Sequence, residues 1–174
     1  GVPVVPRSQV RGFWKKQAAL LIAMRRMEIE VEKALLGGST QGCLVAPELK
    51  AQGTRTLTWD AVARQTGSRV PAEDTLRRTE YVPAGTKLSG VGYLDSPVLG
   101  LRDALERIIR ATNHLGAEGT RGSGLLRVTS LKWSKPASSG PYGPPEAWPD
   151  ASAVRLRLLL KALMPVCIPT TGSP

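Results

Sequence analysis

The segment Gly116–Gly124 holds the residues whose types and spacing point most directly to chemistry. Its sequence, Gly-Ala-Glu-Gly-Thr-Arg-Gly-Ser-Gly, contains four glycines and one arginine. Glycine lets another chain approach the backbone N–H groups closely, and successive N–H groups in turns form concave anion sites. Arg121 adds a side chain that pairs well with phosphate. The segment predicts a phosphate-binding loop; the alternative is a plain connection from a helix to a strand.

Two common nucleotide motifs do not fit this segment. No Lys-Ser or Lys-Thr pair follows Gly124, which excludes a Walker A loop. A Rossmann fingerprint runs from a strand into a helix, and this segment runs in the reverse order. A mononucleotide or dinucleotide cofactor is therefore not expected here.

A second candidate site lies where the first helix begins. Between Arg7 and Arg26 the sequence has six basic residues and no acidic one. A helix N-terminus offers free N–H groups and a partial positive charge, which favour a phosphate. Ser8, Arg11, Lys15 and Lys16 would surround that phosphate. The alternative is an ordinary solvated basic face, and the absence of acids favours binding.

Hydrophobic periodicity sets out the elements that must position these residues. It predicts one long helix, with a break or a short strand near Met27–Val31 as the alternative, and a second helix that opens at Ser96–Pro97. The polar residues 60–80 are expected to form an excursion outside the core, and residues 135–150 a linker. Strands are expected at residues 42–47, 54–59, 86–94, 125–133 and 152–161, and the long helix at residues 9–36.

Composition limits the classes of function. The 174 residues carry 24 Lys plus Arg against 14 Asp plus Glu, a formal charge of +10, which favours a polyanionic partner. Two cysteines and one histidine leave no disulfide scaffold and no Cys or His metal site. The longest apolar run, Ala18–Met24, is seven residues and too short to cross a bilayer. We expect a cytoplasmic protein without a metal or other cofactor.

The element order predicts an α+β fold. A ferredoxin-like, or RNA-recognition-type, sheet has the order strand, helix, strand, strand, helix, strand. All of these elements except the first strand are expected before residue 135. The strand at residues 152–161 is of the right kind to be that first strand, but it lies at the opposite end of the chain.

Residues 4–12, Val-Val-Pro-Arg-Ser-Gln-Val-Arg-Gly, resemble the Ile-Pro-Gly-Ser-Ser-Leu-Arg-Gly motif of the RAMP superfamily. These are the repeat-associated proteins of class 1 CRISPR effector complexes, and the resemblance is to backbone subunits or domains of type III or type IV. Residues 35–42 are similar to the segment after the first helix of that family. Residues 60–86 are similar to its thumb, and residues 116–128 to its glycine-rich loop and the strand that follows.

The resemblance implies a guide-RNA-binding backbone component that holds RNA phosphates while its thumb splays the guide–target duplex. The implied partners are the guide RNA, a target RNA or DNA, and other effector subunits or adjacent RAMP domains. The residues implied to contact RNA come from the helix start, the thumb and the glycine-rich loop. They are Ser8, Gln9, Arg11, Lys15, Lys16, Arg64, Arg77, Gly119, Thr120, Arg121, Gly122 and Ser123.

The resemblance also suggests a division of the chain. Residues 1–134 would form the RNA-binding domain, residues 135–150 a linker, and residues 151–174 the start of a second or permuted RAMP-like unit. Arg7 stands where the family motif has glycine. The stretch that carries the catalytic aspartate in target-cleaving members is not among these residues, so no residue is assigned to catalysis.

Two other functions remain open. A metal-independent RNA-processing endonuclease would use His114 as its general acid or base, because histidine titrates in the required range. A protein interaction module would use the basic helix, with Phe13 and Trp14, to dock an acidic partner or a membrane surface. Trp133 and Trp148 either stack on bases or cover a sheet end.

Overall fold

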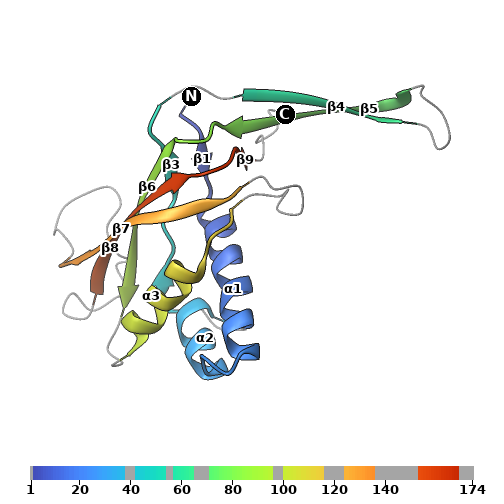
Figure 1. Cartoon of the computed structure of the whole chain (residues 1–174). Coiled ribbons are helices and arrows are strands. Elements are labelled where there is room, and N and C mark those ends of the chain that lie inside the picture. The colour runs from blue at the N-terminus through green and yellow to red at the C-terminus, as the bar shows by residue number, and fades with distance from the viewer. Residues whose placement is uncertain are drawn as a thin grey trace.

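The computed structural model describes residues 2–37, 42–53, 57–64, 71–95, 100–115, 124–135 and 153–168. Within these ranges a main sheet, a layer of helices and a projecting hairpin make up the molecule (Figure 1). The strand pairings are antiparallel. The expected mixture of helices with a mainly antiparallel sheet is confirmed.

The main sheet has the order β1-β3-β6-β8-β7, and β2 also pairs with β6. Strands expected at residues 86–94, 125–133 and 152–161 are confirmed as β6, β7 and β8, which form the long part of the sheet. The short strands β1, β2 and β3 complete it beside β6. The bounds are β1 Val4–Val5, β2 Leu44–Val45, β3 Leu49–Ala51, β6 Lys87–Asp95, β7 Leu126–Ser134 and β8 Ala153–Ala162.

Strand β8 lies between β6 and β7 and pairs with both along nearly its whole length. Its side chains alternate between apolar and mostly basic residues. Leu156, Leu158 and Leu160 are buried in the core, which fixes the face of the sheet that the helices cover. The strand expected to open a second or permuted unit thus lies inside the main sheet. The linker was expected at residues 135–150, and residues 136–150 lie outside the described residues.

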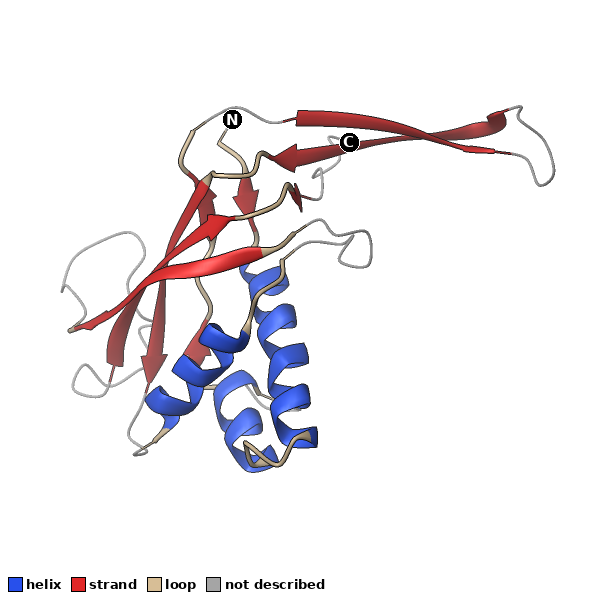
Figure 2. Ribbon diagram, in the orientation of Figure 1, coloured by secondary structure: helices blue, strands red, loops and turns tan. Residues whose placement is uncertain are grey.

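Three helices cover that face (Figure 2): α1 (Arg7–Ala23), α2 (Ile29–Leu36) and α3 (Leu101–Ala111). Helix α1 buries Val10, Trp14, Ala18 and Leu21, at the spacing of three and four that places residues on one side of a helix. Helix α3 follows the same rule with its apolar stripe Leu101, Leu105 and Ile108. These residues form one core cluster with the inner residues of β6 and β8.

The single helix expected over residues 9–36 is wrong, because the chain turns between α1 and α2. Arg25 has a φ of 56°, in the left-handed region, which stops the helix. Its N–H donates to the carbonyl of Ile22, and the N–H of Arg26 donates to the carbonyl of Leu21, both at 2.8 Å. These two bonds make a Schellman motif, which normally has glycine at the left-handed position. An arginine there left the sequence without the usual stop signal.

The excursion expected at residues 60–80 is an antiparallel hairpin of β4 (Leu57–Arg64) and β5 (Pro71–Val82). Strand β9 (Val166–Ile168) pairs with the base of β5, and the three strands form a second sheet. The hairpin extends away from the helices and the main sheet (Figure 1). It leaves the body directly before β6.

Gly124 closes the connection between α3 and β7. Its carbonyl accepts a hydrogen bond from the N–H of Leu115, and its own N–H donates to the carbonyl of Pro165. Its φ is +86°, and a Cβ built there would lie 2.0 Å from the carbonyl oxygen of Leu115. Glycine is therefore required at this position both for conformation and for space.

We predict that Gly124→Ala lowers the free energy of unfolding by about 1–3 kcal/mol more than Gly85→Ala does. Gly85 is the matched control, because its φ is +87° and a Cβ there would meet nothing within 4 Å. Urea denaturation of both variants measures the difference. Equal losses would show that residue 115 does not approach Gly124 this closely.

Candidate nucleic-acid interface

The face of the main sheet opposite the helices is basic. In β8 the residues that alternate with the buried leucines are Arg155, Arg157, Leu159 and Lys161, and they therefore point to this opposite face. Arg157 is exposed, and Arg155 and Lys161 are half-buried. The alternation of residues along β8 thus places the buried leucines on the face that the helices cover and the basic residues on the opposite face.

The register of the sheet brings cations from the neighbouring strands onto the same face. Lys161 lies opposite Arg127 of β7 and Lys87 of β6, and Arg157 lies opposite Lys132 of β7. Directly opposite residues share a face of the sheet. We call this set the cationic sheet face. It consists of Lys87, Arg127, Lys132, Arg155, Arg157 and Lys161.

Little negative charge balances the cationic sheet face. Asp95, at the end of β6, is the sole acidic residue in β6, β7 and β8. Among the described residues, none of the six cations forms an ion pair. The Nε of Arg155 is buried and has no hydrogen-bond partner among the described residues. Like charges on adjacent strands repel, and a bound polyanion would relieve that repulsion.

Other candidate elements meet at one end of this face. The row Lys87, Lys161 and Arg127 lies at the end of the sheet where the hairpin begins, because the N–H of Gly85 donates to the carbonyl of Ala162 at 2.7 Å. The glycine-rich segment begins after Leu115 and ends at Gly124, two residues that are hydrogen-bonded to each other. They lie at this end of the sheet, where Leu126 pairs with Ala162. The N-terminal strand β1, which leads into α1, pairs at the same end (Figure 1).

The residues expected to bind phosphate at the start of α1 differ in their exposure to solvent. Ser8, Lys15 and Lys16 are exposed, and the Lys16 ammonium lies 5.7 Å from the ring centre of Phe13. The Oε1 of Gln9 is buried without a hydrogen-bond partner among the described residues. Phosphate contacts by these residues stay a prediction.

Arg11 has a structural role that the sequence did not indicate. Its Nε donates to the carbonyl of Leu36 at 3.0 Å, and its Nη2 donates to the same oxygen. Leu36 is the last residue of α2, whose final carbonyls lack partners within the helix. The guanidinium therefore ties the start of α1 to the end of α2, and only its remaining donors are available to a phosphate.

The other expected contacts fall on the hairpin or outside the described residues. Arg64 pairs with Pro71 and Arg77 with Ala61, which places both residues within the β4–β5 hairpin. Gly119, Thr120, Arg121, Gly122 and Ser123 lie outside the described residues, and so does Trp148. The expected contact between Arg121 and RNA stays a prediction.

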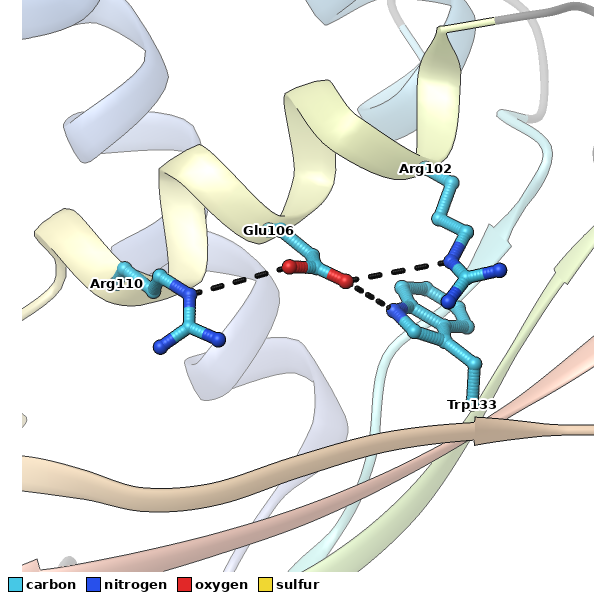
Figure 3. Close-up of polar contacts among 4 residues, drawn as sticks. All are labelled: Arg102, Glu106, Arg110 and Trp133. Carbon is cyan, nitrogen blue, oxygen red and sulfur yellow. Dashed lines mark hydrogen bonds and ion pairs between the residues drawn. The ribbon is translucent and has the colours of Figure 1, made fainter.

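Trp133 is a structural residue on the helix side of β7 (Figure 3). Its Nε1 donates to Oε1 of Glu106 at 2.5 Å. Arg102 and Arg110 flank the same carboxylate, with N···O distances of 4.0 Å and 3.9 Å. The Arg102 guanidinium also lies 5.1 Å from the indole ring centre. This cluster holds α3 against β7, so the indole is not a stacking surface on the cationic sheet face.

His114 forms an isolated bridge with Leu125, and no described hydrogen bond or ion pair involves its imidazole. Burial raises the pKa of the Cys43 thiol; its backbone hydrogen bond lowers it, and the Asp95 charge raises it further. A raised pKa keeps this thiol protonated and unreactive at neutral pH. Within the described ranges, no three His, Cys, Asp or Glu residues gather as metal ligands.

No helix in the described ranges is both long enough and apolar enough to span a bilayer. Searches of family models, curated proteins and solved structures returned no match to this chain.

Sequence reasoning missed the cationic sheet face. Its local signal was the alternation of Val154, Leu156, Leu158 and Leu160 with Arg155 and Arg157, which predicted a strand with one apolar side. The other cations of the face could be recognised only from the register between β8 and its two neighbours.

We predict that Arg11→Met lowers the free energy of unfolding by about 1–2 kcal/mol, because the Leu36 carbonyl loses a charged donor. Lys15→Met removes the same charge from the same helix and changes stability by less than about 0.5 kcal/mol. Chemical denaturation of the two variants compares them. Equal stabilities would argue against the contact between α1 and α2.

Proposed function

We propose that this protein binds single-stranded RNA along the cationic sheet face. The observation that carries the proposal is the set of six cations on one side of β6, β7 and β8, with Asp95 as the single acid in those strands. Lys and Arg side chains that neutralise phosphates supply affinity that does not depend on base sequence. The formal charge of +10 agrees with such a partner.

The character of the face favours contacts to phosphates over reading of bases. Proteins that read single-stranded RNA on a sheet stack bases on exposed aromatic side chains. Tyr93, the aromatic residue of β6 on this side, is 6% exposed, and Trp133 faces the helices. A strand of nucleic acid on this surface would be held by its backbone, which suits a protein that must carry many different sequences.

The sheet topology supports a permuted ferredoxin-like fold. With β8 as the first strand, the chain continues through α1, the β2–β3 segment, β6, α3 and β7, which is the order strand, helix, strand, strand, helix, strand. The spatial order β7-β8-β6-β3 would then place strands four, one, three and two side by side, as in that fold. The strand that the sequence puts at the wrong end would fill the first-strand position.

On this basis we infer a RAMP-type backbone component that holds CRISPR guide RNA. The hairpin leaves the body between the second and third strands of this order, where the resemblance expects the thumb. Its base, the flanks of the glycine-rich segment and the cation row Lys87, Lys161 and Arg127 share one end of the sheet. RNA held along the face would reach the hairpin, which could then separate a guide from its target.

We predict that the double variant Arg157→Gln and Lys161→Gln weakens binding to a labelled single-stranded RNA. The slope of log affinity against log salt should fall by about 1.4, because each lost cation contributes about 0.7 on a single strand. Fluorescence anisotropy over a range of salt concentrations measures both quantities.

The matched control is Lys33→Gln with Arg26→Gln, which removes the same charge from the helix layer. This pair should leave the salt slope nearly unchanged. If both pairs lower it equally, the RNA is attracted only by net charge and the proposed face is wrong. The same conclusion follows if wild-type protein shows no salt-sensitive affinity for RNA.

A further inference from the structure

Residues of the α1–α2 turn and of α3 line a groove. These helix segments lie at the end of α1 away from the hairpin (Figure 1). The volume of the groove is about 610 Å³, within the ~300–1,000 Å³ of typical ligand pockets. The turn between α1 and α2 forms one wall, and the start of α3 forms the other. Its apolar lining consists of Ile22, Met27, Val31, Leu101 and Ala104.

The rim of the groove is basic. Of the described residues that line it, Arg25, Arg26 and Arg107 are basic and Glu28 alone is acidic. The Nη1 of Arg107 donates to the carbonyl of Arg26 at 3.2 Å, so this arginine also bridges the two walls. Arg25 has no hydrogen bond or ion pair of its side chain among the described residues. The groove thus combines an apolar floor with an excess of positive charge.

Large apolar side chains are also exposed near the α1–α2 turn, outside the lining of the groove. Met24 is 60% exposed and Leu20 is 57% exposed, one turn apart on the helix. Ile29, the first residue of α2, is exposed as well.

The backbone of Arg25 gives an independent reason to look here. Its left-handed φ of 56° occupies the Schellman position where glycine is the residue with the lowest conformational cost. The two hydrogen bonds of the motif use backbone atoms only, so the fold has no need of the arginine side chain. A strained residue whose side chain has no structural partner is a candidate for function.

We propose that this groove docks an acidic segment of a partner protein that also carries an apolar side chain. The apolar side chain occupies the floor, and neighbouring carboxylates pair with Arg25 and Arg26. RNA fits less well, because none of the described residues that line the groove is aromatic and could stack on a base. The groove lies on the helix side of the main sheet, so this partner and RNA on the cationic sheet face bind independently.

A labelled peptide tests the groove directly. The probe is a short fluorescein-labelled peptide that repeats Leu-Glu-Glu, and its control repeats Gly-Glu-Glu with the same charge. We expect the leucine peptide to bind and the glycine peptide to bind at least about fivefold more weakly, since burial of one such side chain on the floor exceeds 1 kcal/mol.

Arg25→Gly separates binding from folding. It should leave thermal stability unchanged or raised, because glycine accepts the left-handed φ, and it should weaken the leucine peptide by about fivefold. Lys161→Gln on the cationic sheet face removes an equal charge and should leave peptide binding unchanged. The affinity for single-stranded RNA should fall in Lys161→Gln and stay unchanged in Arg25→Gly.

Four outcomes would overturn the proposal. The first is equal affinity for the two peptides, and the second is equal loss from Arg25→Gly and Lys161→Gln. The third is a loss of RNA or anionic-vesicle binding in Arg25→Gly without any loss of peptide binding. The fourth is a homodimer of the wild-type protein that dissociates in Arg25→Gly, as measured by sedimentation, which would identify the occupant of the groove as a second copy of the chain.

Discussion

The alternation of side chains along β8, in the register that places it between β6 and β7, is the constraint on which the rest of the structure depends. Burial of Leu156, Leu158 and Leu160 contributes roughly 1.5–3 kcal/mol per side chain. Repulsion between directly opposite cations costs only about 0.2–1 kcal/mol per pair. The apolar side therefore sets the register, and the fold tolerates a concentration of positive charge on the opposite side.

This separation gives the molecule two surfaces of different character. The cationic sheet face is nearly without aromatic side chains that reach solvent, and it suits an extended polyanion. The groove between the α1–α2 turn and α3 combines apolar and basic residues, and it suits a peptide. Arg11 joins α1 to α2 through Leu36, and Glu106 joins α3 to the main sheet through Trp133. These two contacts hold the surfaces in a fixed relation.

Local pattern was enough to predict the elements whose periodicity extends over several turns or strand residues. Strands β6, β7 and β8 and the apolar stripe of α3 all follow from such patterns. Strand β2 falls within the strand expected at residues 42–47, whereas β1 and β3 have two and three residues, too few for alternation to be visible. A break near Met27–Val31 was the alternative to one long helix, but local pattern did not mark the stop at Arg25, because this arginine occupies a position that glycine usually marks.

The candidate site was harder to predict, because it depends on pairing between distant segments. Arg155 and Arg157 looked like the polar side of an isolated strand, and nothing local connected them with Lys87, Arg127 or Lys132. Only the register of β8 brings these residues onto one face. Arg11 shows the opposite case, since local charge suggested a phosphate contact and the fold uses its guanidinium to hold a carbonyl.

The most direct test of the account is to measure the reactivity of individual lysines with an acetylating reagent, with and without single-stranded RNA. Peptide mass spectrometry reports each lysine separately, and Lys33, which is exposed on α2, serves as the internal reference. If RNA lies on the cationic sheet face, it should protect Lys87, Lys132 and Lys161 while Lys33 stays reactive. Protection of Lys33 with full reactivity of the three sheet lysines would contradict the account.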